Sequence, residues 1–293
     1  MIRGEAEESL MAIYLGIDGG GSGCRAAVAD AEGRILGRGS AASANIWTDL
    51  PGAAENILAA ARDALAEGAP GAREAEVAAV LGLAGANVPE AARGLARLLP
   101  FGRVAIESDA VVALKGALGD ADGITAAIGT GSVFGAQRGG AITMIGGWGL
   151  KLGDHGGGAA LGRALCVDAL LAHDGEIAAT PLLEGLVARH GGPAGLVVWG
   201  TRASPADFAR LVPELLAAAA AGDPAAEAIL VRAEAEVARA IDRLGRDGAL
   251  PVTFLGGLGG VFATRLAARY AGRIRPARGT GLDGALLMAR RLA

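Results

Sequence analysis

The apolar positions of this chain occur mostly as short runs separated by glycine-rich or polar turns. Three runs open the chain at residues 13–18, 24–29 and 34–38, and each has the length of a buried strand. The turns between them are too short for a crossover helix, so the spacing predicts an antiparallel meander. The same order recurs at residues 123–128, 133–137 and 141–145. We interpret this recurrence as an internal structural duplication.

Longer segments between and after these runs alternate between helical and strand-like patterns, which is typical of an α/β fold. In the second half, Pro213 is expected to break or kink a helix over 205–221. The predicted helices span residues 55–67, 90–99, 110–118, 158–172, 182–189, 205–221, 224–244, 261–270 and 282–290, and the further strands span 77–83, 104–107 and 252–255.

A polar turn at residues 119–123 predicts the boundary between two domains. We expect residues 12–118 to form the N-terminal domain and residues 119–293 the C-terminal one, with the last helix as a candidate for packing back on the first domain. Residues 1–11 are acidic where a signal peptide would be basic, and they are interpreted as an extension outside the fold. The sequence offers no apolar run long enough to span a membrane, and a cytoplasmic protein is expected.

Composition excludes several classes of protein. With 27 basic and 31 acidic residues, the net charge of −4 disfavours a nucleic-acid binder. The 52% of hydrophobic residues include few aromatic ones, so small aliphatic side chains must fill the core. The two cysteines, Cys24 and Cys166, cannot build a disulfide framework. The three histidines lack the spacing of a metal site. Whether the protein forms a homodimer is left open.

Two glycine turns are the strongest chemical signal. Residues 18–23 and residues 129–132 each open a meander, and glycines let the backbone approach phosphate oxygens closely. One such turn alone is more often an ordinary hairpin turn. The only lysines, Lys115 and Lys151, do not follow a glycine loop, which excludes a Walker-type site. The turns also lack the third glycine and the helix of a dinucleotide fingerprint. Together they favour a polyphosphate gripped between two halves.

Two aspartates follow predicted strands. Asp18 ends the first strand, beside the glycine turn, and is interpreted as a Mg²⁺ ligand acting through water or as a turn residue. Asp109 follows the strand at 104–107 and precedes an apolar helix. It is a candidate general base for phosphoryl transfer, whereas the alternative is a helix N-cap served by Ser108 or Asp109.

Three further residues are open to two interpretations each. Asp154 is either the cap of the helix that follows it or a carboxylate that binds sugar hydroxyls. Trp148, in a glycine turn, is either core or the wall of a sugar site. Asn45 is either a loop residue or an amide that binds hydroxyls.

Several segments, taken together and in this order, resemble bacterial glucosamine and N-acetylglucosamine kinases of the actin-like ATPase superfamily. That branch also holds activator ATPases of benzoyl-CoA reductases and hydroxyacyl-CoA dehydratases. The segments are Gly16–Arg25, Ser43–Asn45, Leu83–Ala86, Ser108–Ala110, Gly129–Ser132, Gly146–Gly149, Ala172–Gly175 and Gly284–Leu287.

The resemblance implies two ribonuclease-H-like domains with ATP and an amino sugar in a cleft between them. It implies that Asp109 is the base on the sugar's 6-hydroxyl. The implied ATP contacts are Gly19, Gly20, Gly21, Ser22, Gly129, Thr130, Gly256 and Gly257. The implied sugar contacts are Asn45, Asp109, Gly131, Ser132, Gly147, Trp148 and Asp154.

The function expected from the sequence is therefore ATP- and Mg²⁺-dependent phosphorylation of glucosamine to its 6-phosphate. The alternatives are N-acetylglucosamine phosphorylation and an ATPase that activates an iron–sulfur enzyme. His155 and Gly157 depart from the residues common in the family, Glu or Gln and Ser respectively. These departures bear on the sugar contacts that follow Asp154.

Overall fold

The computed structural model describes residues 13–21, 23–246 and 250–292. The described chain divides into two compact units. The first holds the residues up to Asp120 and those from Ala277 onward, and the second holds Ala121–Pro276. Ser22 and the predicted extension at residues 1–11 lie outside the described residues. Each unit is built on one mixed sheet, which confirms the predicted α/β class.

The first unit contains a five-stranded sheet in the order β3-β2-β1-β4-β5. The predicted meander pairs antiparallel, and β4 and β5 then add parallel to β1. Its elements are β1 (Tyr14–Gly19), β2 (Cys24–Ala29), β3 (Ile35–Ala41), α1 (Leu50–Gly68), a 3₁₀ turn (Glu74–Glu76), β4 (Ala78–Leu83), α2 (Pro89–Ala96), β5 (Arg103–Ser108), α3 (Asp109–Leu118) and α11 (Gly281–Ala289).

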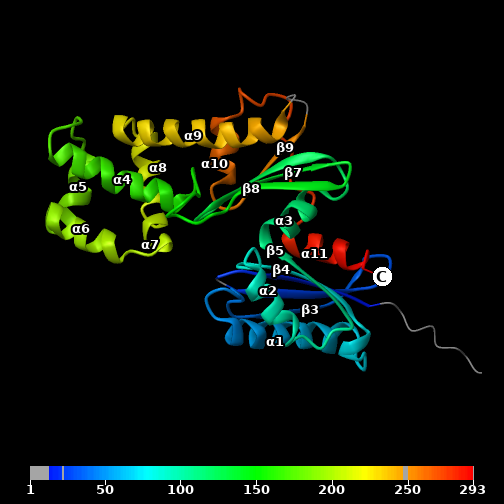
Figure 1. Ribbon diagram of the computed structural model, residues 1–293. Helices are drawn as coiled ribbons and strands as arrows, with labels where there is room; N and C mark the ends of the chain where they lie inside the picture. Colours follow the sequence, from blue (N-terminus) through cyan, green and yellow to red (C-terminus); the bar gives the residue numbers. More distant parts are fainter. Residues whose placement is uncertain (1–12, 22, 247–249, 293) are drawn as a thin grey trace, which may run out of the picture. The chain divides into compact units, whose positions relative to one another are not determined.

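Helices cover both faces of this sheet (Figure 1). Leu15, Ile17 and Leu81 pack in the cluster on the α1 and α2 side, whereas Tyr14 and Val80 pack against α3 and α11 on the other. Burial on both faces explains why β1 and β4 are continuous apolar runs instead of alternating ones.

Glycines let α3 and α11 cross at backbone distance. A Cβ atom on Gly116 would lie 1.7 Å from the carbonyl oxygen of Thr280, and one on Gly284 would lie 2.0 Å from that of Val112. This crossing is why the C-terminal segment belongs to the first unit. The sequence-based division assigned residues 119–293 to the second domain, with the last helix as a candidate for packing back on the first.

The second unit repeats the topology with a four-stranded sheet in the order β8-β7-β6-β9. Ile274 forms one further parallel bridge with Val252 of β9, at the position that β5 has in the first unit. Its elements are β6 (Gly123–Ile128), β7 (Ser132–Arg138), β8 (Ala141–Gly146), α4 (Gly158–His173), α5 (Pro181–Arg189), α6 (Pro193–Arg202), α7 (Pro205–Ala209), α8 (Val212–Ala220), α9 (Pro224–Gly245), β9 (Val252–Leu255) and α10 (Gly259–Arg265).

The break expected near Pro213 in the helix over 205–221 is present in the structure. The segment forms two helices, α7 and α8, with Pro213 in the first turn of α8, where its missing N–H costs nothing. Two other helices differ from the sequence predictions. The helix α6 was not predicted, because its glycines and proline resemble a loop. The helix expected at 261–270 is α10, which begins and ends earlier.

Candidate functional site

The first glycine turn joins β1 to β2. The Gly20 amide donates to the Gly23 carbonyl (2.9 Å), and the Gly20 carbonyl accepts from the Ala44 amide (3.0 Å). Gly19 is packed, since a Cβ there would lie 2.7 Å from that of Ala44. A Cβ on Gly20 or on Gly21 would have no other atom within 4 Å, so open space borders the turn. A ligand can therefore reach this backbone.

Asp18 lies in β1 immediately before the turn. Its Oδ2 accepts a hydrogen bond from Nη2 of Arg25, opposite it on β2, at 2.7 Å. A Cβ on Gly281, the first residue of α11, would lie 3.1 Å from the Asp18 carboxyl carbon. The first turn of α11 and the Arg25 guanidinium therefore both lie against the Asp18 carboxylate. Arg25 and Gly281 carry roles here that the sequence interpretation missed.

Asp109 is the first residue of α3, and Ser108 is the N-cap. The Ser108 hydroxyl oxygen accepts from the Val111 amide, so of the two capping candidates the serine does the capping. Oδ1 of Asp109 accepts from the Ala110 amide at 2.9 Å. The side chain reaches solvent, yet desolvation by the surrounding protein raises the pKa of the Asp109 carboxyl, and the charge of Asp18 adds to the shift. This environment makes Asp109 a stronger base than an ordinary aspartate.

Asn45 organises its own loop. Its Oδ1 accepts from the amides of Trp47 (3.0 Å) and Thr48 (3.3 Å), an Asx turn. Asn45 therefore acts as a loop residue in the structure. Its Nδ2 group makes no hydrogen bond to the described residues. Trp47 beside it is 64% exposed.

The second glycine turn, in the second unit, sits on the N-terminus of α4. The carbonyls of Gly129 and Thr130 accept from the amides of Gly158 (2.8 Å) and Ala159 (2.9 Å). These bonds satisfy the first amides of the helix and fix the turn. The Thr130 side chain is exposed, so its hydroxyl is accessible to a ligand.

Asp154 locks this turn to the turn after β8. It has a left-handed backbone, with φ 57°, and its Oδ1 accepts from the Gly149 amide at 3.1 Å. A Cβ on Gly131 would lie 2.4 Å from its Oδ2. The N-cap of α4 is Gly157, so the capping interpretation of Asp154 is wrong. A left-handed non-glycine residue held by such contacts is typical of functional sites.

Contacts within the second unit explain the residue types at two positions near Asp154. A Cβ on Gly157 would lie 2.7 Å from the carbonyl carbon of Gly131, so the departure from the family residue accompanies a close backbone approach. The buried Ser132 hydroxyl donates to the carbonyl of His155 at 2.7 Å. That bond uses its one proton, which leaves Ser132 only acceptor capacity for a sugar.

Trp148 is 69% exposed, so its interpretation as core is wrong. Gly146, Gly147 and Gly149 around it all have positive φ, which the sharp turn requires. Beside the tryptophan, a cavity of about 270 Å³ is lined from one side by the 152–155 loop and from the other by α9. Glu236 of α9 lies there, with its Oε1 3.7 Å from Nδ1 of His155.

The glycine pair after β9 divides by role. Gly256 has φ 82°, and a Cβ on it would lie 2.4 Å from the carbonyl oxygen of Ile128, so this position requires glycine. Gly257 faces open space.

Among the described residues, no cluster of three or more His, Cys, Asp or Glu side chains could hold a metal ion. No described helix is long and apolar enough to cross a membrane.

Comparison with known proteins places this chain in a family. The model of the BadF/BadG/BcrA/BcrD ATPase family matches residues 15–271. The chain belongs to this family. The family assignment confirms the resemblance seen in the glycine turns and in the segments around Ser108 and Gly146.

Two relatives of this ATPase family member cover nearly the whole chain. Glucosamine kinase GspK of Vibrio cholerae is 29% identical over 282 residues, 95% of this chain and 96% of its own. A crystal structure from Chromobacterium violaceum, provisionally named an N-acetylglucosamine kinase, is 31% identical with a TM-score of 0.84 and covers 95% of this chain and 99% of its own.

A third comparison concerns the fold alone. The ROK hexokinase of Thermus thermophilus is 21% identical, with a TM-score of 0.56, and covers 96% of this chain and 98% of its own. The predicted pair of domains of the actin-like ATPase type is confirmed by these likenesses.

Proposed function

We propose that this protein is an ATP-dependent amino-sugar kinase that transfers the γ-phosphate of ATP to the 6-hydroxyl of glucosamine. The observation that carries the proposal is the Asp109 carboxyl, which is accessible and follows β5 directly. Ser108 caps α3, so Asp109 is not needed as the cap, and the pKa of Asp109 is raised. The similarity to glucosamine kinase GspK over 95% of the chain supports the choice of substrate class.

In the proposed reaction, Asp109 accepts the proton of the 6-hydroxyl as its oxygen bonds to the γ-phosphorus and the bond to the β-phosphate oxygen breaks, giving ADP. A raised pKa suits this task, because proton affinity and ionisation must both be appreciable near neutral pH. The negative charge of Asp18 holds Asp109 more basic without a direct hydrogen bond.

Backbone groups are the proposed ATP contacts. We assign the phosphates to the two glycine turns, because Gly20, Gly21 and Thr130 border open space or solvent. The assigned contacts are Gly19, Gly20, Gly21, Ser22, Gly129 and Thr130, with Gly256 and Gly257 toward the nucleoside.

Asp18 fits a Mg²⁺ ion that is bound mainly by phosphates and water. Such ions need one or two protein carboxylates and no closed cage. Because Arg25 occupies Oδ2, we assign the metal side to Oδ1 or to a water on it. Bound Mg²⁺ would neutralise charge on the β- and γ-phosphates.

The sugar is assigned to the loops around Trp148 and Asp154. The exposed Trp148 ring offers an apolar wall, and Asp154 Oδ2 offers an acceptor for a hydroxyl. Gly131, Ser132 and Gly147 would contribute backbone or acceptor contacts, as would the Nδ2 group of Asn45.

N-acetylglucosamine is the second candidate substrate, favoured by the likeness to the Chromobacterium violaceum structure. The iron–sulfur activator role has less support from the two thiols. Burial raises the pKa of Cys24 to about 12 and that of Cys166 to about 11, which disfavours the thiolates that ligate a cluster.

Initial rates of ADP formation on a panel of hexoses and amino sugars test the proposal. We expect the highest kcat/KM for glucosamine and a 6-phosphate product by NMR. A clear preference for N-acetylglucosamine would select the second substrate. ATP turnover that no sugar stimulates would contradict the kinase function.

A further inference from the structure

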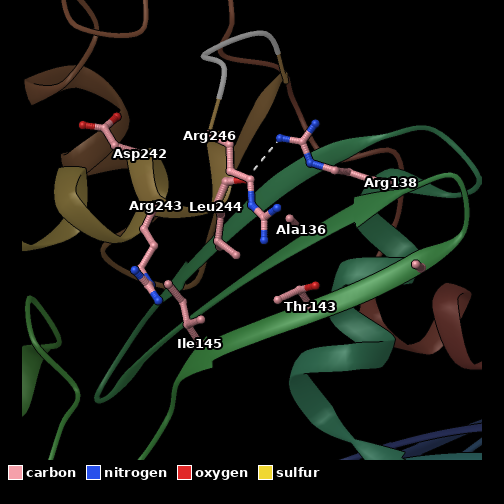
Figure 2. A pocket seen from close by; sticks show the side chains of 9 residues that line it. Ala136, Arg138, Thr143, Ile145, Asp242, Arg243, Leu244 and Arg246 are labelled. Atoms are coloured by element: carbon pink, nitrogen blue, oxygen red, sulfur yellow. Dashed lines mark hydrogen bonds between the residues drawn. The ribbon is translucent and has the colours of Figure 1, made fainter.

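A charged trough runs along the second unit between β8 and the C-terminal half of α9. Its larger part is a cavity of about 660 Å³, whose floor is formed by Ala136, Thr143 and Ile145 of β7 and β8 (Figure 2). The cavity beside Trp148 continues it, because Ile145 and Arg243 line both. The trough has the size of a small-molecule site.

Three arginines line the trough: Arg239 and Arg243 of α9, and Arg246, the residue that follows the helix. The i, i+4 spacing puts Arg239 and Arg243 on one face of the helix. Figure 2 shows the Arg246 side chain near Ala136 and the Arg243 side chain near Ile145. Within the described parts of the chain, none of the three has a carboxylate partner.

Other arginines of the same unit are paired. Arg232 of α9 bonds to Asp168 at 2.7 Å, and Arg269 bonds to Asp242 at 2.6 Å. Asp242 therefore does not neutralise the positive charge of the trough, and in Figure 2 its side chain points away from the strands. Arg239 and Arg243 lie one turn apart on α9, where like charges repel one another. Together with Arg246 beside them, they favour an anion from outside.

Attraction to the negative end of α9 explains only part of this pattern. Arg138 of β7 already serves that end, since its Nη2 donates to the carbonyls of Leu244 (3.2 Å) and Gly245 (2.9 Å). Arg239 lies more than a turn from the end of the helix, beyond the reach of the dipole effect.

We propose that this trough binds a small phosphate-bearing anion. Guanidinium groups are suited to phosphate because they donate two parallel hydrogen bonds to its oxygens. Three of them around one trough fit two anionic groups, or one phosphate on a sugar, better than a single inorganic ion. The Thr143 hydroxyl on the floor adds a donor.

Hydrogen–deuterium exchange with pyrophosphate and with glucosamine 6-phosphate locates the site. We expect slower exchange in residues 136–146 and 236–246, separate from any effect on the glycine turns. Tighter binding of one probe identifies its source as a sugar phosphate or a free polyphosphate. Protection confined to the glycine turns would overturn the proposal and leave the kinase assignment untouched.

The variant Arg243→Gln/Arg246→Gln tests the arginines by calorimetry. Loss of two charge-assisted contacts should weaken binding of the better probe at least tenfold and remove the protection. Arg202→Gln is the matched control, because Arg202 is also an exposed arginine in the last turn of a helix, α6. Unchanged affinity in the double variant, with a normal melting profile, would refute the site.

Discussion

The two units share a sheet topology but use it differently. In the first, carboxylates stand at the ends of β1 and β5, and the glycine turn borders open space. In the second, the equivalent turn is tied to α4 and locked by Asp154, so its exposed groups are backbone and a threonine. One duplicated scaffold thus presents carboxylates in one copy and a rigid frame in the other.

The difference follows from what lies between the strands. The connection from β3 to β4 contains one long helix, α1, whereas that from β8 to β9 contains α4 to α9. The longer insertion supplies the helix N-terminus that fixes the second turn and the arginine face of α9. Duplicated units can diverge in this way because loops tolerate insertions better than sheets do.

The largest expected effect concerns chemistry in the first unit. Asp109→Asn should lower kcat by about 10²–10⁴-fold, because asparagine keeps the shape but accepts no proton. Steady-state rates with ATP and glucosamine measure it. Ser108→Ala is the control: it should cost about 1 kcal/mol of stability through the lost cap but keep kcat within a few-fold. A fully active Asp109→Asn protein would eliminate Asp109 as the base.

The open turn of the first unit should be sensitive to bulk without being important for the fold. Gly20→Val should weaken ATP binding by about 10²–10⁴-fold, the value of two lost charge-assisted hydrogen bonds. Calorimetry measures the ATP affinity of the variant, and a thermal melt measures the stability of its fold. Gly200→Val, at another open glycine on α6, should leave ATP affinity unchanged. Normal ATP binding by Gly20→Val would remove the turn from the nucleotide site.

The locked frame of the second unit should respond in stability. Gly256→Ala should cost about 2–4 kcal/mol, because it combines a left-handed backbone with a Cβ 2.4 Å from the Ile128 oxygen. Its neighbour faces open space, so Gly257→Ala should change the free energy of unfolding by less than about 0.5 kcal/mol. Denaturant titrations compare the two. Equal costs would show that the frame is less rigid than its contacts indicate.

The smallest effect concerns pH. Because the pKa of Asp109 is raised, kcat/KM should fall, as pH decreases, at a higher pH than an ordinary aspartate would cause. Asp18→Asn removes a negative charge and should move this acid limb to lower pH. Glu107→Gln is the control, since the Glu107 charge does not contribute to the shift. If the acid limb of the pH profile does not move in Asp18→Asn, the charge of Asp18 does not influence the pKa of Asp109.

The same shift affects stability with a definite sign. Between the ordinary and the raised pKa of Asp109, the folded state binds more protons than the unfolded state. Its contribution to the free energy of unfolding therefore falls as pH rises through that window. The site thus gives up some stability to obtain a stronger base.

The sequence by itself determined the strands, the two glycine turns and the family. These features are local: an apolar run of this length between turns is typical of a buried strand, and glycines mark turns without help from the rest of the chain. The duplication was visible for the same reason. Asp18 and Asp109 were identifiable because each directly follows or ends such a run.

Only the tertiary structure decided which neighbours those residues have. The capping choice between Ser108 and Asp109 and the use of the Ser132 hydroxyl depend on atoms that sequence spacing does not locate. Gly281 reaches Asp18 from the far end of the chain, because glycines let α11 cross α3 closely. The arginines at the end of α9 became meaningful once β8 lay opposite them and Asp242 had paired with Arg269. Side-chain chemistry of this kind is set by long-range packing, which no local pattern encodes.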